Sequence, residues 1–268
     1  MMKLCCASWG FRFYGIKDYI EAASKLGFEY IEINCHPDIP LHLTDEMTRA
    51  ELMQIRSLAL KNNVRIVAIA GGNDFLQTDL KALNKQIQTV KRTIEITSDI
   101  GAEIVRIFAG FTPEEKLNED SYKIAADAIN EVDNYAQKMG VRLAIENHGG
   151  ITGKVSSIKH LFDYISSFNV GLTYDPANFV PSHEEPTKIL FELPEKIFYV
   201  HLKDALIKNG ESEYCKIGQG IVDYNQILQQ LANRNGYMAI EYENASNVEE
   251  GTLHDLQEIK RILHELRI

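Results

Sequence analysis

The sequence predicts an α/β protein that forms one (β/α)₈ barrel, the TIM barrel fold, as a single domain over residues 1–268. Short apolar runs alternate with longer amphipathic stretches along the chain, as they do in parallel βαβ units. There are eight such runs, and 268 residues are close to the roughly 250 that eight units need. Apolar residues make up 45% and charged residues 25%, a balance typical of globular proteins.

Individual strands and helices are predicted from the period of the apolar residues and from the residues that end each element. The strands are expected at residues 3–9, 28–34, 64–70, 103–109, 141–146, 170–175, 197–203 and 237–242. The helices are expected at residues 16–26, 46–62, 79–100, 119–139, 154–167, 184–192, 223–234 and 251–266. A glycine that would stop a helix follows Leu26, Ile100, Met139 and Asn235. An open doubly wound sheet is the alternative, but no glycine-rich nucleotide fingerprint follows the first strand.

Three features of the sequence bear on the binding partners and the cellular compartment of the protein: its net charge, its opening residues and its cysteines. A formal net charge of −10 argues against a nucleic-acid-binding surface, which needs clustered Lys and Arg. The opening sequence MMKLCCASWGF predicts neither a secretory leader nor a membrane anchor. The cysteines form no CxxC pair, so we expect free thiols in a cytoplasmic protein, with Cys5 and Cys6 as apolar strand residues. A homo-oligomer is compatible with these features.

Polar or ionisable residues stand at or just beyond the ends of seven predicted strands. They are Glu32, Asn73, Arg106, Glu146, Asp175, His201 and Glu241. The carboxyl ends of the strands of such a barrel meet at one mouth, where active sites lie. Residues two apart on a strand share a face. The residues two positions before Glu146, Asp175, His201 and Glu241 are small or polar, so we expect them to face the barrel interior together with these four. The large residues Ile145, Leu172, Leu202 and Ile240 should then face the helices.

Glu146, Asp175, His201 and Glu241 are the strongest candidates for a chemical site. One of them lies at the end of each of the last four predicted strands. Carboxylates suit Mg²⁺ and Mn²⁺, and an imidazole also suits Mn²⁺, Co²⁺ or Zn²⁺. A single carboxylate at a strand end is more often a helix cap or a surface ion pair. Four in succession instead indicate one divalent metal site.

Several short motifs resemble those of the xylose-isomerase-like sugar phosphate isomerase/epimerase superfamily. The main four are IENHGG (145–150), YDPANF (174–179), VHLKDA (200–205) and IEYEN (240–244). GGNDF (71–75), GAEIVRIFAG (101–110) and KIGQG (216–220) support them. The resemblance implies a TIM barrel with one Mn²⁺, Mg²⁺, Co²⁺ or Zn²⁺ on Glu146, Asp175, His201 and Glu241. Manganese is our first choice.

The resemblance leaves the reaction open, because the superfamily includes ketose 3-epimerases, hydroxypyruvate isomerases, inosose and dehydroshikimate dehydratases, keto-glycoside lyases and endonuclease IV repair enzymes. The chain lacks the richer histidine set and the positive charge of the repair nucleases. It also carries Asn178 where ketose 3-epimerases have His, three residues after the metal-binding Asp. The sugar preference of those epimerases therefore does not transfer directly.

The chemistry of such a site predicts a sugar or sugar phosphate isomerase or epimerase. A metal that chelates a carbonyl and the adjacent hydroxyl stabilises a cis-enediolate. Glu146 and Glu241 would then remove and return the proton as paired acid and base. Loss of a leaving group from the same intermediate would make the protein a dehydratase or lyase on a keto-sugar, keto-glycoside or cyclitol. A noncatalytic sugar-binding barrel is a third hypothesis.

Candidate substrate contacts follow from position. They are Trp9, Glu32, Arg106, His148, Asn178, Lys203 and Lys216. Several have a structural alternative: aromatic packing for Trp9 and its neighbour Phe11, interior ion pairs for Arg106 and Lys203, and the orientation of a neighbour for Glu32. His148 can equally be a loop residue with no role. The segment 205–222, which contains Lys216, is too long for a simple βα turn and is expected to be a functional loop.

Overall fold

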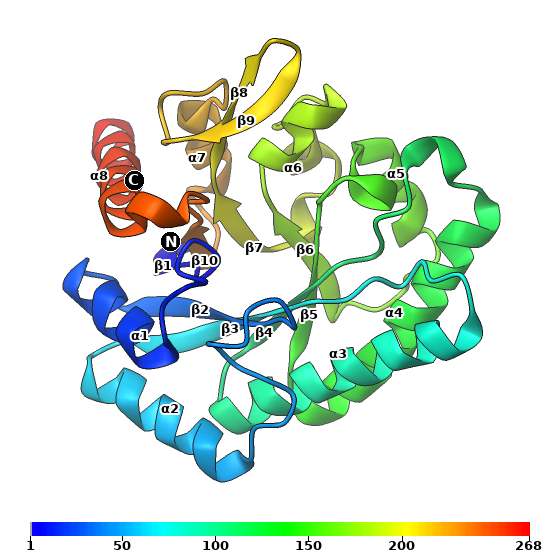
Figure 1. Ribbon diagram of the computed structural model, residues 1–268. Coiled ribbons are helices and arrows are strands. Elements are labelled where there is room, and N and C mark those ends of the chain that lie inside the picture. Colours follow the sequence, from blue (N-terminus) through cyan, green and yellow to red (C-terminus); the bar gives the residue numbers. More distant parts are fainter. Residues whose placement is uncertain (1) are drawn as a thin grey trace.

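A computed structural model describes residues 2–268 and contains a closed parallel barrel (Figure 1). Neighbouring strands follow the order β1-β2-β3-β4-β5-β6-β7-β10, and β10 pairs with β1 to close the ring. The barrel strands are β1 (Met2–Cys6), β2 (Tyr30–Cys35), β3 (Arg65–Gly71), β4 (Ile104–Ile107), β5 (Arg142–Glu146), β6 (Val170–Tyr174), β7 (Ile197–Leu202) and β10 (Gly236–Ile240). All eight overlap the predicted strands, which confirms the fold class.

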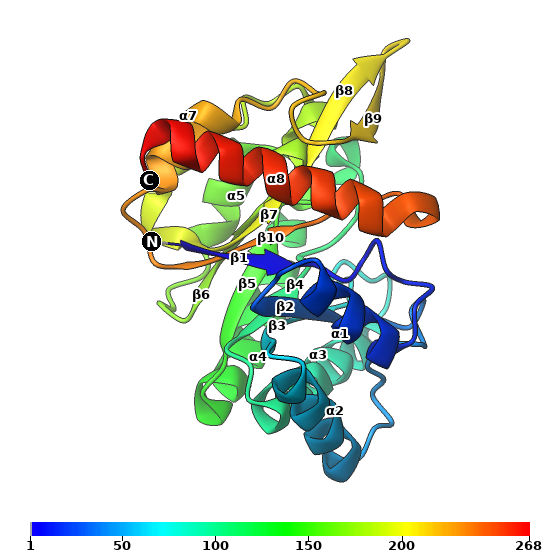
Figure 2. The ribbon, with the colours of Figure 1, turned by 90° about the vertical axis from the view of Figure 1, so that its left-hand side faces the viewer.

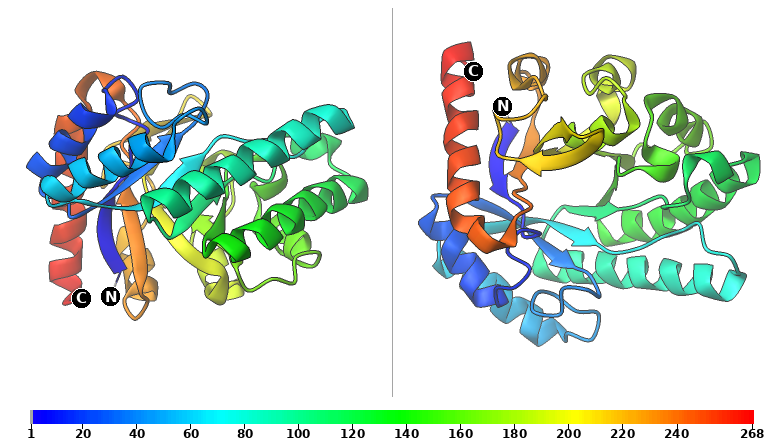
Figure 3. Two further views of the ribbon diagram at one scale, coloured as in Figure 1. Left: turned by 90° about the horizontal axis from the view of Figure 1, so that it is seen from below. Right: turned by 45° about the horizontal axis from the view of Figure 1, so that its top comes forward.

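Helices form the outer layer, and α8 lies beside the first and last barrel strands (Figure 3). They are α1 (Ile16–Lys25), α2 (Arg49–Lys61), α3 (Leu80–Ile100), α4 (Glu119–Met139), α5 (Val155–Phe162), α6 (Lys188–Glu192), α7 (Tyr224–Leu231) and α8 (Val248–Leu266). Gly101 and Gly140 end α3 and α4 in the left-handed conformation, as predicted. The prediction at Asn235-Gly236 was wrong, because α7 already ends at Leu231 and Gly236 begins β10.

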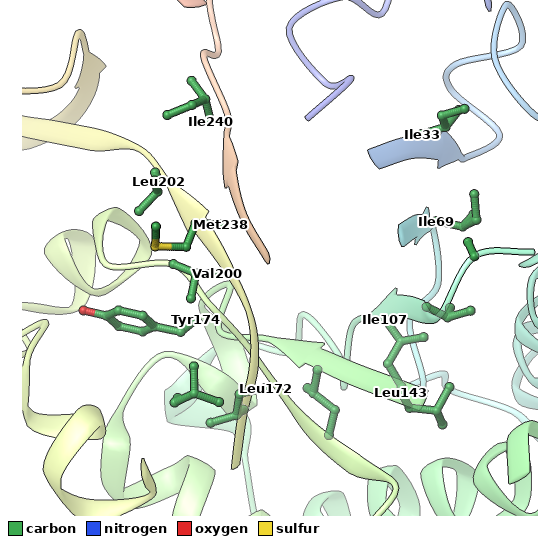
Figure 4. Packing of buried hydrophobic residues seen from close by; sticks show 14 of the residues in the cluster. Ile33, Ile69, Ile107, Leu143, Leu172, Tyr174, Val200, Leu202, Met238 and Ile240 are labelled. Carbon is green, nitrogen blue, oxygen red and sulfur yellow. The ribbon is translucent and has the colours of Figure 1, made fainter. Parts of the chain in front are cut away.

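The two faces of each barrel strand carry different side chains, as the alternation predicted. Ile145, Leu172, Leu202 and Ile240 belong to the large core between the strands and the helices. Figure 4 shows Leu172, Leu202 and Ile240 among the residues of this core. A second, smaller cluster contains three of the residues predicted for the barrel interior, Ala144, Tyr199 and Ala239, and Thr173 is buried as well. Filling the interior with side chains makes the barrel a packed support for its rim.

The segment after β7 contains a β-hairpin that the sequence prediction missed. β8 (Asp204–Lys208) pairs antiparallel with β9 (Glu211–Cys215). The two turn residues, Asn209 and Gly210, both have positive φ, at 54° and 86°. Asn-Gly is the preferred pair for such a two-residue turn, so this dipeptide was the available signal. The hairpin projects from the end of the barrel toward which the strands point (Figure 2).

Other predictions concern the membrane and the thiols. Within residues 2–268, no helix is both long and apolar enough to cross a membrane. All four cysteines are free, and Cys5, Cys6 and Cys35 are buried. The expectation of unpaired thiols is therefore confirmed.

Candidate metal centre

Four ionisable side chains meet at the mouth of the barrel. Glu146 is the last residue of β5, Asp175 follows β6, His201 lies in β7 and Glu241 follows β10. These four strands are neighbours, so the residues occupy one half of the rim. All four are buried, and their ligand atoms lie within 4.8 Å of one another. The structure thus brings together the four residues that the sequence predicted.

The donor atoms of this group fit a divalent ion. Asp175 Oδ1 accepts hydrogen bonds from the backbone N–H groups of Ala177 and Asn178, whereas its Oδ2 is buried and forms an ion pair with Lys203 Nζ at 3.0 Å. His201 Nδ1 is also buried without a hydrogen bond and lies 3.4 Å from carboxylate oxygens of Glu146 and Glu241. Carboxylate oxygens around one imidazole nitrogen form a suitable ligand set for Mg²⁺, Mn²⁺ or Zn²⁺. These four residues can therefore hold a metal ion.

Glu32 orients the imidazole from the opposite side of the barrel. Its Oε2 lies 3.0 Å from His201 Nε2. An ionised carboxylate only accepts hydrogen bonds, so the proton belongs on Nε2 and Nδ1 faces the other carboxylates. Burial would lower the pKa of His201, but Glu241, Glu32 and Glu146 outweigh it and raise the pKa well above its usual value. The same negative field favours a cation at Nδ1.

Two polar neighbours hold the carboxylate of Glu146. Arg106 Nε lies 3.2 Å from Oε2, and Asn178 Nδ2 donates to Oε1 at 3.2 Å. The guanidinium also donates to Gly71 O and packs over the ring of Phe108. Burial would raise the pKa of Glu146, but Arg106 and then His201 lower it to about 2. Glu146 is therefore a carboxylate at neutral pH.

Lys203 neutralises part of the remaining negative charge. Its Nζ lies 3.0 Å from Asp175 Oδ2, 3.0 Å from Glu241 Oε2 and 2.9 Å from Glu243 Oε1. Burial would lower the pKa of Lys203, but these three carboxylates raise it well above its usual value. The pKa of Glu241 is held well below its usual range by His201 and Lys203 against the effect of burial, while burial raises the pKa of Asp175 to about 6.

Asn147 fixes the backbone that carries Asp175. Its Nδ2 donates to Asp175 O at 2.7 Å, and Asp175 N–H donates to Asn147 Oδ1 at 2.8 Å. This pair of hydrogen bonds ties the end of β5 to the end of β6, next to a register shift between β6 and β7 at Leu172 and Thr173. Asn147 is thus a positioning residue that the sequence analysis did not single out, although it directly follows Glu146.

A pocket of about 380 Å³ opens beside the metal ligands. Its lining includes six residues that the sequence predicted for the site: Trp9, Arg106, Glu146, His148, Lys203 and Glu241. It also includes six that were missed: His36, Asp38, Phe108, Phe111, Tyr214 and Glu243. Small-molecule sites have volumes of roughly 300–1,000 Å³, so the pocket suits a small ligand. Glu243 could have been found, because it lies two residues after Glu241 at the same end of β10.

The remaining predicted residues occupy different places. Lys216 pairs with Glu250 at 2.7 Å and is not among the residues that line the pocket. Asn73 bonds the backbone of Phe108 through both its amide oxygen and its amide nitrogen. Phe11 is buried in the core, which confirms the packing alternative for that ring. His148 packs edge-on against Phe108 and Phe111 in the pocket wall.

A larger and more open hollow, of about 830 Å³, lies far from the metal ligands. It is lined by residues of α4 and of the segment before β6, including Asp133, Gln137, Phe168 and Asn169. Gly140 and Asn169 precede β5 and β6, so the hollow belongs to the amino end of the strands. Barrel enzymes place their chemistry at the carboxyl end. The smaller pocket is therefore the candidate active site.

The chain belongs to the xylose isomerase-like TIM barrel family, whose sequence model matches residues 20–262. It is 24% identical over 223 residues to an inosose isomerase of Bacillus velezensis, which covers 81% of this chain and 78% of the relative. It is 25% identical over 219 residues to an inosose dehydratase of Bacillus thuringiensis, which covers 70% of this chain and 72% of the relative. The solved structure of the IOLI protein with a binding zinc atom superposes with a TM-score of 0.80 at 20% identity, over 98% of this chain and 97% of that one.

Proposed function

We propose that the protein is a divalent-metal-dependent isomerase or epimerase of a small sugar or sugar phosphate. One observation carries this proposal: the carboxylates of Glu146 and Glu241 flank His201 Nδ1, each at 3.4 Å, and both residues line a pocket of small-molecule size. With a carboxylate on either side of the substrate, a site can remove a proton from one face of a carbon. It can then deliver a proton to the opposite face of that carbon or to the neighbouring carbon.

The proposed ion is held by Glu146, Asp175, His201 and Glu241, with Mn²⁺ as the first choice. When bound, it would polarise a substrate carbonyl and stabilise the negative charge that develops on its oxygen. The zinc atom in the structure of the IOLI protein supports a metal in a protein of this fold. Glu32 would keep the Nδ1 lone pair directed at this position through its contact with Nε2.

The protein side chains would carry the proton steps. Glu146, an ionised carboxylate, takes the proton from the carbon next to the substrate carbonyl; the C–H electron pair enters the new C=C bond, and the carbonyl oxygen becomes an enediolate oxygen. If Glu146 returns that proton to the former carbonyl carbon, and the proton of the adjacent hydroxyl moves to the former carbonyl oxygen, the product is the aldose–ketose isomer. For the epimer, Lys203 Nζ, 3.0 Å from Glu241 Oε2, would pass a proton to that carboxylate, and Glu241 would deliver it to the other face of the carbon. The proton held by Glu146 would leave to solvent, and Lys203 would take up a proton from solvent.

Part of the pocket wall would serve substrate binding. Trp9, Phe108 and Phe111 offer aromatic surface for the C–H face of a sugar, while Lys203 and His148 offer polar groups. Asn178 and Arg106 would act mainly through Glu146, which both contact directly. Lys216 is left out of these contacts, because its ammonium pairs with Glu250 outside the lining.

A dehydratase is the second candidate function. The inosose dehydratase of Bacillus thuringiensis, at 25% identity, favours it as much as the inosose isomerase favours the first. The two reactions share the proton-removal step and differ in whether a hydroxyl β to the new carbanion leaves as water. Glu146, ionised at the start, would remove the proton and then, as the protonated acid, give that proton to the hydroxyl that leaves as water, while Glu241 would stay a carboxylate.

Proton NMR in deuterated water distinguishes the candidates. The metal-loaded protein is incubated with free ketoses, ketose phosphates and inososes, each with Mn²⁺, Mg²⁺, Co²⁺ or Zn²⁺. Solvent deuterium in an otherwise intact sugar supports the isomerase or epimerase, and loss of water supports the dehydratase. A Glu146→Gln, Glu241→Gln double variant that keeps full activity would refute the assignment of both carboxylates.

A further inference from the structure

We propose that the β8–β9 hairpin controls the position of Glu146 through Tyr214 and Asn178, so that Tyr214 is a positioning residue for the reaction. The inference rests on the proposed function for its catalytic consequence. The hydrogen bonds that carry it run from the Tyr214 hydroxyl to Asn178 Oδ1, at 3.0 Å, and from Asn178 Nδ2 to Glu146 Oε1, at 3.2 Å.

The direction of these hydrogen bonds follows from the chemistry of the groups. Ionised Glu146 can only accept, so the amide of Asn178 must turn its NH₂ group toward the carboxylate. The amide oxygen then faces the hairpin and needs a donor, because Asn178 is buried. Tyr214 supplies that donor, and burial raises the pKa of its hydroxyl to about 12, so the proton is present at neutral pH.

The hairpin also touches the site at a second point. Lys203 Nζ lies 4.4 Å from the centre of the Tyr214 ring, a cation–π contact on the ammonium that bonds Asp175 and Glu241. The hairpin packs on η3 (Ala177–Ser182), the short helix that contains Asn178. Tyr214 is 43% exposed and lines the pocket, so it lies between solvent and the metal ligands.

This arrangement couples an element outside the barrel to a carboxylate inside it. When the hairpin lies against η3, Tyr214 completes the hydrogen bonding of Asn178, and Asn178 holds one oxygen of Glu146 while Arg106 holds the other. When the hairpin moves away, the buried amide loses a partner and the restraint on Glu146 weakens. A ligand that presses on Tyr214 in the pocket would therefore favour the ordered carboxylate.

A double-mutant cycle tests the coupling with Mn²⁺ alone as the first probe. The variants are Tyr214→Phe, which keeps the ring, Asn178→Ala, and both together. Ile207→Ala is the matched control, because Ile207 lies on the same hairpin, is 42% exposed and is absent from the pocket lining. Mn²⁺ dissociation constants are measured by titration. The kcat and KM of whichever substrate the NMR panel identifies are measured on the same variants.

We expect Tyr214→Phe to weaken Mn²⁺ binding and to lower kcat by about threefold to tenfold, the effect of one hydrogen bond, with KM nearly unchanged. We expect Asn178→Ala to have an effect at least as large and the double variant to be no worse than Asn178→Ala, because the hydroxyl acts through the amide. Ile207→Ala should match the wild type in both measurements.

Three results would overturn the proposal. Tyr214→Phe could leave Mn²⁺ affinity and kcat unchanged. The two single effects could multiply in the double variant, which would make them independent. Tyr214→Phe could raise KM alone, which would make Tyr214 a direct substrate contact. If none of the sugars in the NMR experiment reacts, the proposed function is refuted. The double-mutant cycle measured by Mn²⁺ affinity would still test the coupling completely.

Discussion

Two asparagines make the same bridge at the rim of the barrel, one in each half. Asn73 ties the segment after β3 to the residue after β4, through Nδ2 to Phe108 O at 2.7 Å and from Phe108 N–H to Oδ1 at 3.0 Å. Asn147 ties the ends of β5 and β6 through the equivalent two bonds to Asp175. The bridge in the first half supports an aromatic residue of the pocket wall, whereas the bridge in the second half supports Asp175, one of the four residues of the candidate metal centre.

The comparison extends to the charged residues of the two halves. The ionisable residues of the first half that enter the barrel are Glu32 on β2 and Arg106 on β4. Glu32 contacts His201 across the barrel, and Arg106 contacts Glu146 at the end of the neighbouring strand β5. The second half holds the carboxylates that would bind the ion. In the proposed function, the first half would support the site by orienting and neutralising its side chains, and the second half would carry the chemistry. A substitution at the rim should lower the stability of the fold in either half. It should weaken metal binding or activity mainly when it lies in the second half.

The largest effect is expected from removing a charge of the second half. Glu146→Gln should lower the rate of solvent-deuterium exchange into substrate by on the order of 10²–10⁴, the usual contribution of a general base. Glu103→Gln is the matched control, since Glu103 is an exposed carboxylate directly before β4, at the opposite end of the barrel, and should keep the wild-type rate. Equal rates for Glu146→Gln and the wild type would remove the base from the proposal.

The asparagine pair offers the sharpest test of the comparison. Asn73→Ala and Asn147→Ala should each lower the free energy of unfolding by about 1–3 kcal/mol, because each leaves buried backbone groups of the next strand without partners. Only Asn147→Ala should also weaken Mn²⁺ binding, by about 10–100-fold, since it supports a ligand. Urea unfolding and Mn²⁺ titration measure the two quantities. Weaker Mn²⁺ binding in both variants, to the same extent, would show that the halves do not differ in this way.

A smaller effect is expected at Asp255, a buried carboxylate outside the metal centre. It accepts a hydrogen bond from Ile217 N–H at 2.8 Å, and burial raises its pKa to about 6. Because the pKa in the folded state lies above the unfolded value of 3.8, this group favours folding at low pH, and the benefit is lost as the pH rises from about 4 through about 6. The amide of Asn can still accept from Ile217 without carrying charge.

Asp255→Asn should therefore stabilise the protein by about 1–2 kcal/mol at pH 7.5, and the gain should shrink at pH 5. Thermal unfolding at the two pH values measures it, with Glu115→Gln, in an exposed short helix, as the control that should change nothing. A variant that is less stable than the wild type at pH 7.5 would mean that the ionised carboxylate stabilises the fold.

The sequence predicted the parts of this molecule that depend on local periodicity. The barrel, the alternation of Ala144, Glu146 and their neighbours, and the meeting of Glu146, Asp175, His201 and Glu241 at the strand ends all follow from local patterns of strand residues. The contacts across the barrel could not be predicted, because the approach of Glu32 to His201 depends on how the closed sheet staggers its strands. Tyr214 was missed for another reason: its strand is polar, and only the Asn-Gly turn indicated a hairpin.

Equilibrium binding of Mn²⁺ to the metal-free protein tests the central claim most directly. We predict one ion per chain in the wild type and a higher unfolding temperature at saturation, because the ion binds the folded state. His201→Ala should abolish both effects, while Asn73→Ala should keep the stoichiometry and the affinity. A wild type that binds no divalent ion, or a His201→Ala variant that binds one ion as tightly as the wild type, would contradict the assignment of Glu146, Asp175, His201 and Glu241 as a metal centre.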